Sequence, residues 1–147
     1  MVIDDEEALV RLATETLAEI GYAVVGFTSS AKAIEAFVAN PHHFDLVVTD
    51  ESMPGFSGSE LIRKMRSVRP TLPILLMSGY LSAAVVERAR EAGATEVLKK
   101  PLSVRQLEIA VVRSLLPTSG PDASDIASSR LRERTGKPRH KGGLSQS

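Results

Sequence analysis

The chain has 147 residues, of which 43% are apolar and 4% are aromatic. This length suits one domain with an extension, and the apolar fraction is enough for one core built mainly from aliphatic side chains. The sequence contains 0 Cys residues, which excludes disulfides, thiolate metal sites and cysteine nucleophiles.

Charged residues balance overall but not along the chain. Residues 1–116 carry 15 Asp and Glu against 12 Lys and Arg, a net charge of −3, whereas residues 117–147 carry 3 against 6, a net charge of +3. Residues 1–116, with their net negative charge, lack the clustered basic face that nucleic-acid binding requires. The apolar runs are about six residues long, far below the ~20 needed to span a bilayer, and no basic segment leads into an apolar one at the start. We therefore expect a cytoplasmic protein that contacts neither nucleic acid nor membrane.

The first part of the chain predicts two strand-helix units. The first three residues are apolar, and residues 6–20 repeat apolar side chains at helical spacing. These side chains are Leu9, Leu12, Ala13, Leu17 and Ile20. Residues 22–27 have the composition of a strand, and Ser29 or Ser30 caps a second helix that ends before Pro41.

Three more strand-helix units follow. In chain order they are a strand at 44–49, a helix at 59–68, a strand at 73–77, a helix at 82–92, a strand at 95–98 and a helix that Ser103 caps and Pro117 ends. In the last helix one face is expected to be apolar, with Val104, Leu107, Val111 and Leu115. The runs at 44–49 and 73–77 are largely apolar throughout, as strands buried on both faces are.

This alternation predicts an α/β fold in which a five-stranded parallel sheet has helices on both faces. We expect the flavodoxin-like, doubly wound strand order 2-1-3-4-5, in which the first and third strands are neighbours at the switch point. Only three residues precede Asp4, so the first strand is short and suggests a missing N-terminal piece. Residues 117–147 lack apolar periodicity and predict a disordered basic tail.

Residues that handle phosphoryl groups follow four of the predicted strands. They are the pair Asp4-Asp5, Asp50, Ser78 and the pair Lys100-Pro101. The carboxyl ends of parallel strands meet at one edge of the sheet, where open α/β folds bind ligands. Each piece alone has an ordinary explanation as a helix start, a turn or a solvated lysine. Their occurrence after successive strands, in this order, indicates one shared site.

Three clustered carboxylates repel one another unless a cation joins them. Magnesium prefers oxygen ligands, so Asp4, Asp5 and Asp50 predict a Mg²⁺ site. Lys100 then meets one phosphoryl oxygen, and the hydroxyl of Ser78 donates to another. The remaining candidates are backbone N–H groups of Glu51 and Gly79, which complete the phosphate cradle, and Pro101, which forms a cis peptide bond or shapes the loop.

These pieces resemble the receiver domain of two-component response regulators. The matching segments are Ile3-Asp4-Asp5-Glu6, Asp50 to Gly58, Met77-Ser78-Gly79-Tyr80, Ala92-Gly93-Ala94 and Lys99-Lys100-Pro101-Leu102. The resemblance covers residues 1–116, which we take as the receiver domain. It is compatible with a stand-alone regulator and with the C-terminal receiver of a hybrid sensor histidine kinase.

The resemblance implies a role for each matching position. Asp50 would be the phosphoacceptor, which receives its phosphoryl group from a histidine kinase or a histidine phosphotransfer domain. The backbone carbonyl of Ser52 would join the aspartates as a Mg²⁺ ligand, and Ser78 with Lys100 would sense the phosphate. A downstream protein target would bind through the face built from residues 82–115.

One position departs from the family pattern. Members often carry Tyr or Phe three residues before the lysine of the Lys-Pro pair, and here that residue is Val97. The usual aromatic readout is therefore missing, and Tyr80 is a weak substitute, since a loop tyrosine is ordinarily just exposed.

Two other classes of protein remain as alternatives. An aspartyl-phosphate hydrolase of the haloacid dehalogenase type needs Asp-x-Asp after a strand, but Ser52 stands where its acid/base would be. A pseudo-receiver would bind partners without phosphorylation, and the intact acidic set argues against it. Slow self-dephosphorylation leaves open whether the chain counts as an enzyme; a parent hybrid protein would be a histidine kinase.

Overall fold

A computed structural model describes residues 1–116, and the tail predicted at 117–147 lies outside the described residues. Five parallel strands form one sheet with the order β2-β1-β3-β4-β5. Their bounds are β1 Val2–Ile3, β2 Gly26–Phe27, β3 Val47–Asp50, β4 Ile74–Ser78 and β5 Glu96–Lys99. The predicted flavodoxin-like fold, strand order and short first strand are confirmed.

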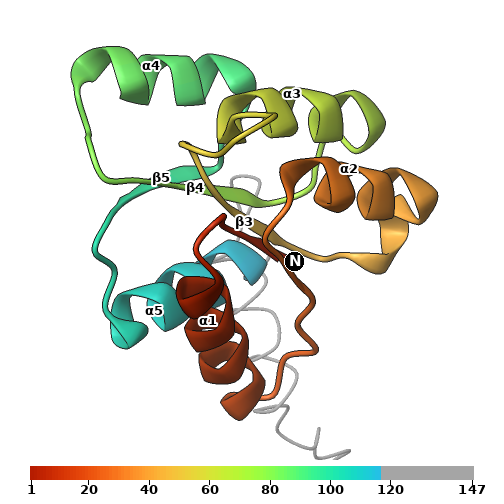
Figure 1. The fold of residues 1–147 in the computed structure, drawn as a ribbon, viewed down its shortest axis with the longest axis vertical. Coiled ribbons are helices and arrows are strands. Elements are labelled where there is room, and N and C mark those ends of the chain that lie inside the picture. Colours follow the sequence, from red (N-terminus) through yellow and green to blue (C-terminus); the bar gives the residue numbers. More distant parts are fainter. Residues whose placement is uncertain (117–147) are drawn as a thin grey trace, which may run out of the picture. The chain divides into compact units, whose positions relative to one another are not determined.

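Residues 1–116 form five α-helices, of which four connect successive strands and the fifth follows β5. They are α1 Glu7–Glu19, α2 Ser30–Ala39, α3 Gly58–Val68, α4 Ala83–Ala92 and α5 Val104–Leu115, and a short 3₁₀ helix, η1 Pro41–His43, follows α2. Helices α2, α3 and α4 cover one face of the sheet, and α1 and α5 cover the other (Figure 1). Within residues 1–116, no helix is long and apolar enough to cross a membrane.

Serine caps begin four of these helices. Ser29, Ser57, Ser82 and Ser103 each accept a hydrogen bond from the backbone N–H three residues later. In α3 and α5 the cap is reciprocal, because the side chains of Glu60 and Gln106 accept from the backbone N–H of the capping serine. The helix starts therefore lie at defined positions beside the carboxyl ends of the strands.

The core has two layers, one on each face of the sheet. Neighbouring strand residues point to opposite faces, so Ile3 and Leu76 join the layer under α2, α3 and α4, while Val2 and Leu75 join the layer under α1 and α5. All four are at most 1% exposed. This burial on both sides explains why the central strands read as continuous apolar runs.

Some predicted bounds were wrong. The strand expected at 22–27 is reduced to β2, because this edge strand pairs only with the two residues of β1. The strand expected at 44–49 begins at Val47, where its ladder with β4 starts. Of the two predicted caps of the second helix, Ser29 is the one observed, and Ser30 is the first residue of α2.

Candidate functional site

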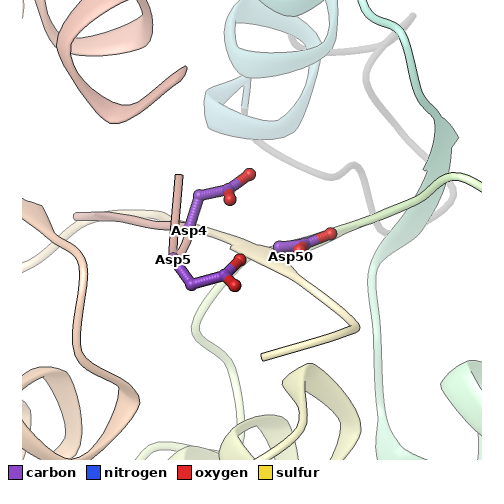
Figure 2. A group of neighbouring side chains, drawn as sticks. All are labelled: Asp4, Asp5 and Asp50. Carbon is purple, nitrogen blue, oxygen red and sulfur yellow. The ribbon is translucent and has the colours of Figure 1, made fainter. Parts of the chain in front are cut away.

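The four predicted pieces come together at the carboxyl edge of the sheet. Asp4 follows β1, Asp50 ends β3, Ser78 ends β4, and Lys100 follows β5. Figure 2 shows Asp4 and Asp5 on the segment after β1 and Asp50 beside them, with the three carboxylates turned toward one side. One oxygen from each of these carboxylates lies within 4.8 Å of the other two. Strand order alone produces this cluster, because β1 and β3 are neighbours.

Asp4 is fully buried and held by two hydrogen bonds. Its Oδ1 accepts from the backbone N–H of Glu6 at 3.0 Å, and its Oδ2 accepts from Lys100 Nζ at 2.8 Å. Buried carboxylates are stable only when such partners are present. Asp5, the next residue, is exposed.

Asp50 shares the same lysine. Its Oδ1 lies 3.2 Å from Lys100 Nζ, and only 6% of the residue is exposed. Burial raises the pKa of Asp50 above its ordinary value, and the negative charge of Asp4 raises it further, against the opposing effect of Lys100. Ionised Asp50 is therefore a costly state of the metal-free site.

The pKa of Lys100 shifts upward, although burial by itself lowers it. Hydrogen bonding and charge from Asp4 raise this pKa, and Asp50 adds to the effect. Both pKa shifts are upward, so the site favours the protonated form of each group, which is charged for Lys100 and uncharged for Asp50. We attribute this to the shorter bond to Asp4, which neutralises the lysine first and leaves Asp50 only partly compensated.

The hydroxyl of Ser78 points to its own loop in this structure. Ser78 Oγ donates to the carbonyl oxygen of Tyr80 at 2.9 Å and accepts from the N–H of Tyr80 at 3.3 Å. Tyr80 itself is 72% exposed. The backbone after β5 is tied to the same strand end, since the Lys100 N–H donates to the carbonyl oxygen of Ser78 at 2.9 Å. The Lys100–Pro101 peptide bond is cis.

One predicted phosphate ligand is already used elsewhere. The N–H of Glu51 donates to the carbonyl oxygen of Met77 at 2.9 Å, as part of the ladder between β3 and β4. The N–H of Glu51 is engaged in this structure because ladder bonding continues one residue past Asp50, and its role toward phosphate stays a prediction. Gly79 lies on the open edge, where an added Cβ would meet no atom within 4 Å.

Sequence reasoning missed a set of contacts around the segment that follows Asp50. Glu51 is buried and its carboxylate binds Ser59 at the start of α3, and Ser30 of α2 binds the backbone of Pro54 and Phe56. Polar residues at such spacings are common in exposed loops, so the pattern carries no signal by itself. Their burial in the structure distinguishes them.

A cavity of about 750 Å³ adjoins the carboxylates. Beyond Asp50 and Lys100 its walls are mainly apolar and come from α1, the sheet and the start of α5; they include Leu9, Leu12, Val48, Met77, Leu102 and Leu107. The site therefore lies at the mouth of this apolar chamber, and Asp50 forms part of the chamber lining.

The donor set fits a hard divalent cation. Three carboxylates converge within 4.8 Å, which suits the oxygen preference of Mg²⁺ and leaves positions for water and phosphoryl oxygens. Lys100 now provides part of the positive charge that such a cation would bring. Thiolate and imidazole ligands are absent from this cluster, which disfavours zinc.

Comparison with known proteins agrees with this geometry. The chain is 35% identical over 142 residues to the response regulator protein FleR of Pseudomonas aeruginosa, covering 90% of this chain and 29% of FleR. It is 37% identical over 119 residues to the transcriptional regulatory protein PdtaR of Mycobacterium tuberculosis, covering 77% of this chain and 57% of PdtaR. The chain thus spans less than two thirds of either relative.

A solved structure shares the fold. The non-phosphorylated HemR receiver domain of Leptospira biflexa matches with a TM-score of 0.74 at 27% identity, covering 81% of this chain and 94% of that domain. Residues 1–112 match the family model of the response regulator receiver domain. Neither the hydrolase nor the pseudo-receiver is favoured by these matches. The chain belongs to the response regulator receiver domain family of two-component systems.

Proposed function

We propose that Asp50 is the phosphoacceptor of this receiver domain and that Asp4, Asp5 and the backbone carbonyl of Ser52 hold Mg²⁺ beside it. The convergence of two other carboxylates, Asp4 and Asp5, and of Lys100 on Asp50 carries this proposal. A carboxylate attacks a phosphoryl group poorly while like charges surround it, so an acceptor needs cationic groups within reach.

In the proposed reaction an Oδ of Asp50 attacks the phosphorus atom of a phosphohistidine. A new O–P bond forms, the P–N bond breaks, and the electron pair of that bond returns to the imidazole of the donor. Bound Mg²⁺ would supply the positive charge that the phosphoryl oxygens need. In this reaction Lys100, which lies 3.2 Å from Asp50 Oδ1, would orient the acceptor carboxylate.

Two side chains are proposed to bind the transferred group. Lys100 would exchange its contact with Asp50 for a phosphoryl oxygen, and Ser78 would turn its hydroxyl from Tyr80 toward another. The N–H of Gly79 would donate to the phosphoryl group as well. These exchanges would bias the 79–103 region between two arrangements.

Receiver domains interact with histidine kinases and downstream effectors. For this chain we propose a histidine kinase or histidine phosphotransfer domain as donor and a protein target that binds through residues 82–115. A cytoplasmic location goes with these partners. The domain would serve in a stand-alone regulator or as the receiver of a hybrid sensor kinase, and the coding sequence upstream of Met1 discriminates between the two.

Acetyl phosphate with Mg²⁺ tests the assignment of Asp50. The wild-type chain is expected to gain one phosphoryl group, with acetate as the leaving group, whereas Asp50→Asn gains none. Asp45→Asn is the matched control, since Asp45 is an exposed aspartate outside the carboxylate cluster. Intact-mass measurement reads out all three proteins. An unmodified wild type, or equal modification of wild type and Asp50→Asn, would contradict the assignment.

A further inference from the structure

Glu51, the acidic residue that follows the acceptor Asp50, is buried directly after β3. Glu51 is only 9% exposed and Ser59, the second residue of α3, only 2%. One carboxylate oxygen of Glu51 accepts two hydrogen bonds from this serine, from its backbone N–H at 3.1 Å and from its hydroxyl at 2.7 Å. The contact joins the end of β3 to the start of α3.

Physical chemistry makes this contact specific. A buried carboxylate costs free energy unless donors surround it, and the first turn of a helix supplies free N–H groups and a favourable dipole. Ser59 adds a hydroxyl donor at the same place. The side chain of Glu51 therefore has one favourable position, above the start of α3.

The backbone of Glu51 is fixed as well. Its N–H donates to the carbonyl oxygen of Met77 at 2.9 Å, and its carbonyl oxygen accepts from the N–H of Gly58 at 3.0 Å. A Cβ on Gly58 would lie 2.4 Å from the carbonyl oxygen of Asp50. Helix α3 thus abuts the backbone of Asp50 and Glu51 directly.

The later part of the loop between β3 and α3 is hydrogen-bonded to a residue of α2. Ser30 Oγ donates to the carbonyl oxygen of Pro54 at 3.0 Å and accepts from the N–H of Phe56 at 3.0 Å. The loop between β3 and α3 is therefore attached at both ends. These hydrogen bonds restrict the movement by which the loop could accommodate a rotation of the Glu51 backbone.

We propose that Glu51 and Ser59 act as positioning residues for the metal and phosphoryl site. Glu51 stands between Asp50, which offers its carboxylate, and Ser52, which offers its backbone carbonyl. Turning the Glu51 residue displaces both groups at once, so the contact with Ser59 sets their mutual geometry. This inference rests on the proposed function and extends it to two residues that position the proposed ligands without binding Mg²⁺ themselves.

Mg²⁺ titration of the metal-free chain, followed by NMR, tests the inference without any catalytic readout. Ser59→Ala is expected to weaken Mg²⁺ affinity about 10-fold, the lower end of the usual effect of an outer-layer partner. Ser57→Ala is the matched control, because it removes the N-cap of the same helix but not the contact with Glu51. It should lower the urea midpoint and leave Mg²⁺ affinity unchanged.

A second pair of variants separates position from charge and guards against misfolding of Ser59→Ala. Glu51→Gln keeps an oxygen acceptor for both donors of Ser59 and should bind Mg²⁺ like the wild type. Glu51→Ala loses both hydrogen bonds, whereas Ser59→Ala keeps the one from its backbone N–H, so Glu51→Ala should bind Mg²⁺ at least as weakly as Ser59→Ala. Equal affinities for all folded variants would overturn the positioning role while the wild type still binds Mg²⁺. A wild type that binds no Mg²⁺ would instead overturn the proposed function.

Discussion

Lys100 Nζ lies 2.8 Å from Asp4 Oδ2, so the loop after the last strand is joined to the loop after the first. The pair is largely buried, with side-chain exposures of 18% for Lys100 and 1% for Asp4. Because the same ammonium group also lies 3.2 Å from Asp50, it occupies the space between the two carboxylates. A metal ion that enters the cluster must compete with this lysine.

Replacement of Lys100 by methionine should strengthen Mg²⁺ binding. We expect about 5-fold tighter binding, because two like charges about 4 Å apart repel by ~1 kcal/mol even in water. Lys99→Met is the control, since Lys99 is the exposed neighbour. Isothermal titration of both variants measures the effect. Weaker binding by Lys100→Met would mean that the lysine supports the metal site.

Asp4 and Asp5 should differ in what they contribute. Asp4→Asn places an amide donor where Lys100 needs an acceptor, so it should lower the free energy of unfolding of the metal-free chain by about 2 kcal/mol. Asp5→Asn changes an exposed side chain and should alter that free energy by less than ~0.5 kcal/mol. Urea unfolding in EDTA measures both.

Both variants should bind Mg²⁺ at least about 10-fold more weakly than the wild type. If Asp5→Asn bound Mg²⁺ as tightly as the wild type, Asp5 would not be a metal ligand. Asp4 and Asp50 would then be the side-chain ligands.

Asp50→Asn should stabilise the metal-free chain at neutral pH. The pKa of Asp50 is raised from 3.8, so the folded chain holds its proton at pH values where the unfolded chain has lost it. Wild-type stability therefore falls as the pH rises from 3.8 through the folded pKa, and ionised Asp50 remains a cost above that range.

We expect a gain of about 1 kcal/mol at pH 7, the usual size of a single-site effect. The gain should vanish at pH values below 3.8, where the wild-type carboxyl is protonated in both states. Thermal unfolding in EDTA across this pH range measures it. A gain that is independent of pH would indicate a cause other than ionisation of Asp50.

Gly58 and Gly79 should differ strongly in their tolerance of alanine. A Cβ on Gly58 would lie 2.4 Å from Asp50 O and 2.5 Å from Leu76 Cδ1, whereas one on Gly79 meets nothing within 4 Å. Gly58→Ala should cost at least about 3 kcal/mol of unfolding free energy through overpacking, although alanine is the better helix former. Gly79→Ala should change it by less than ~0.5 kcal/mol. Similar urea midpoints for the two variants would contradict the close approach at Gly58.

The fold and the main site were predictable because they depend on order along the chain. The alternation of strands and helices along the chain indicates a parallel sheet, and the doubly wound strand order puts Asp4 beside Asp50. The side-chain roles of Ser78 and Lys100 stay predictions, although both lie at the expected edge.

Packing that depends on a neighbouring helix was not predictable. Leu12 and Val104 belong to the predicted apolar helix faces but are 50% and 44% exposed, and both line the apolar chamber between α1 and the start of α5. The apolar spacing of a helix does not reveal how closely its neighbour approaches. In the same way, the contact between Glu51 and Ser59 depends on the direct approach of α3 to β3, which only the three-dimensional structure shows.

The close approach at Gly58 also determines how movement passes through the domain. The start of α3 rests on the carbonyl oxygen of Asp50 with backbone against backbone, so no side chain lies between them to deform and absorb a displacement. We therefore expect a shift of α3 to displace the backbone of the acceptor residue as well.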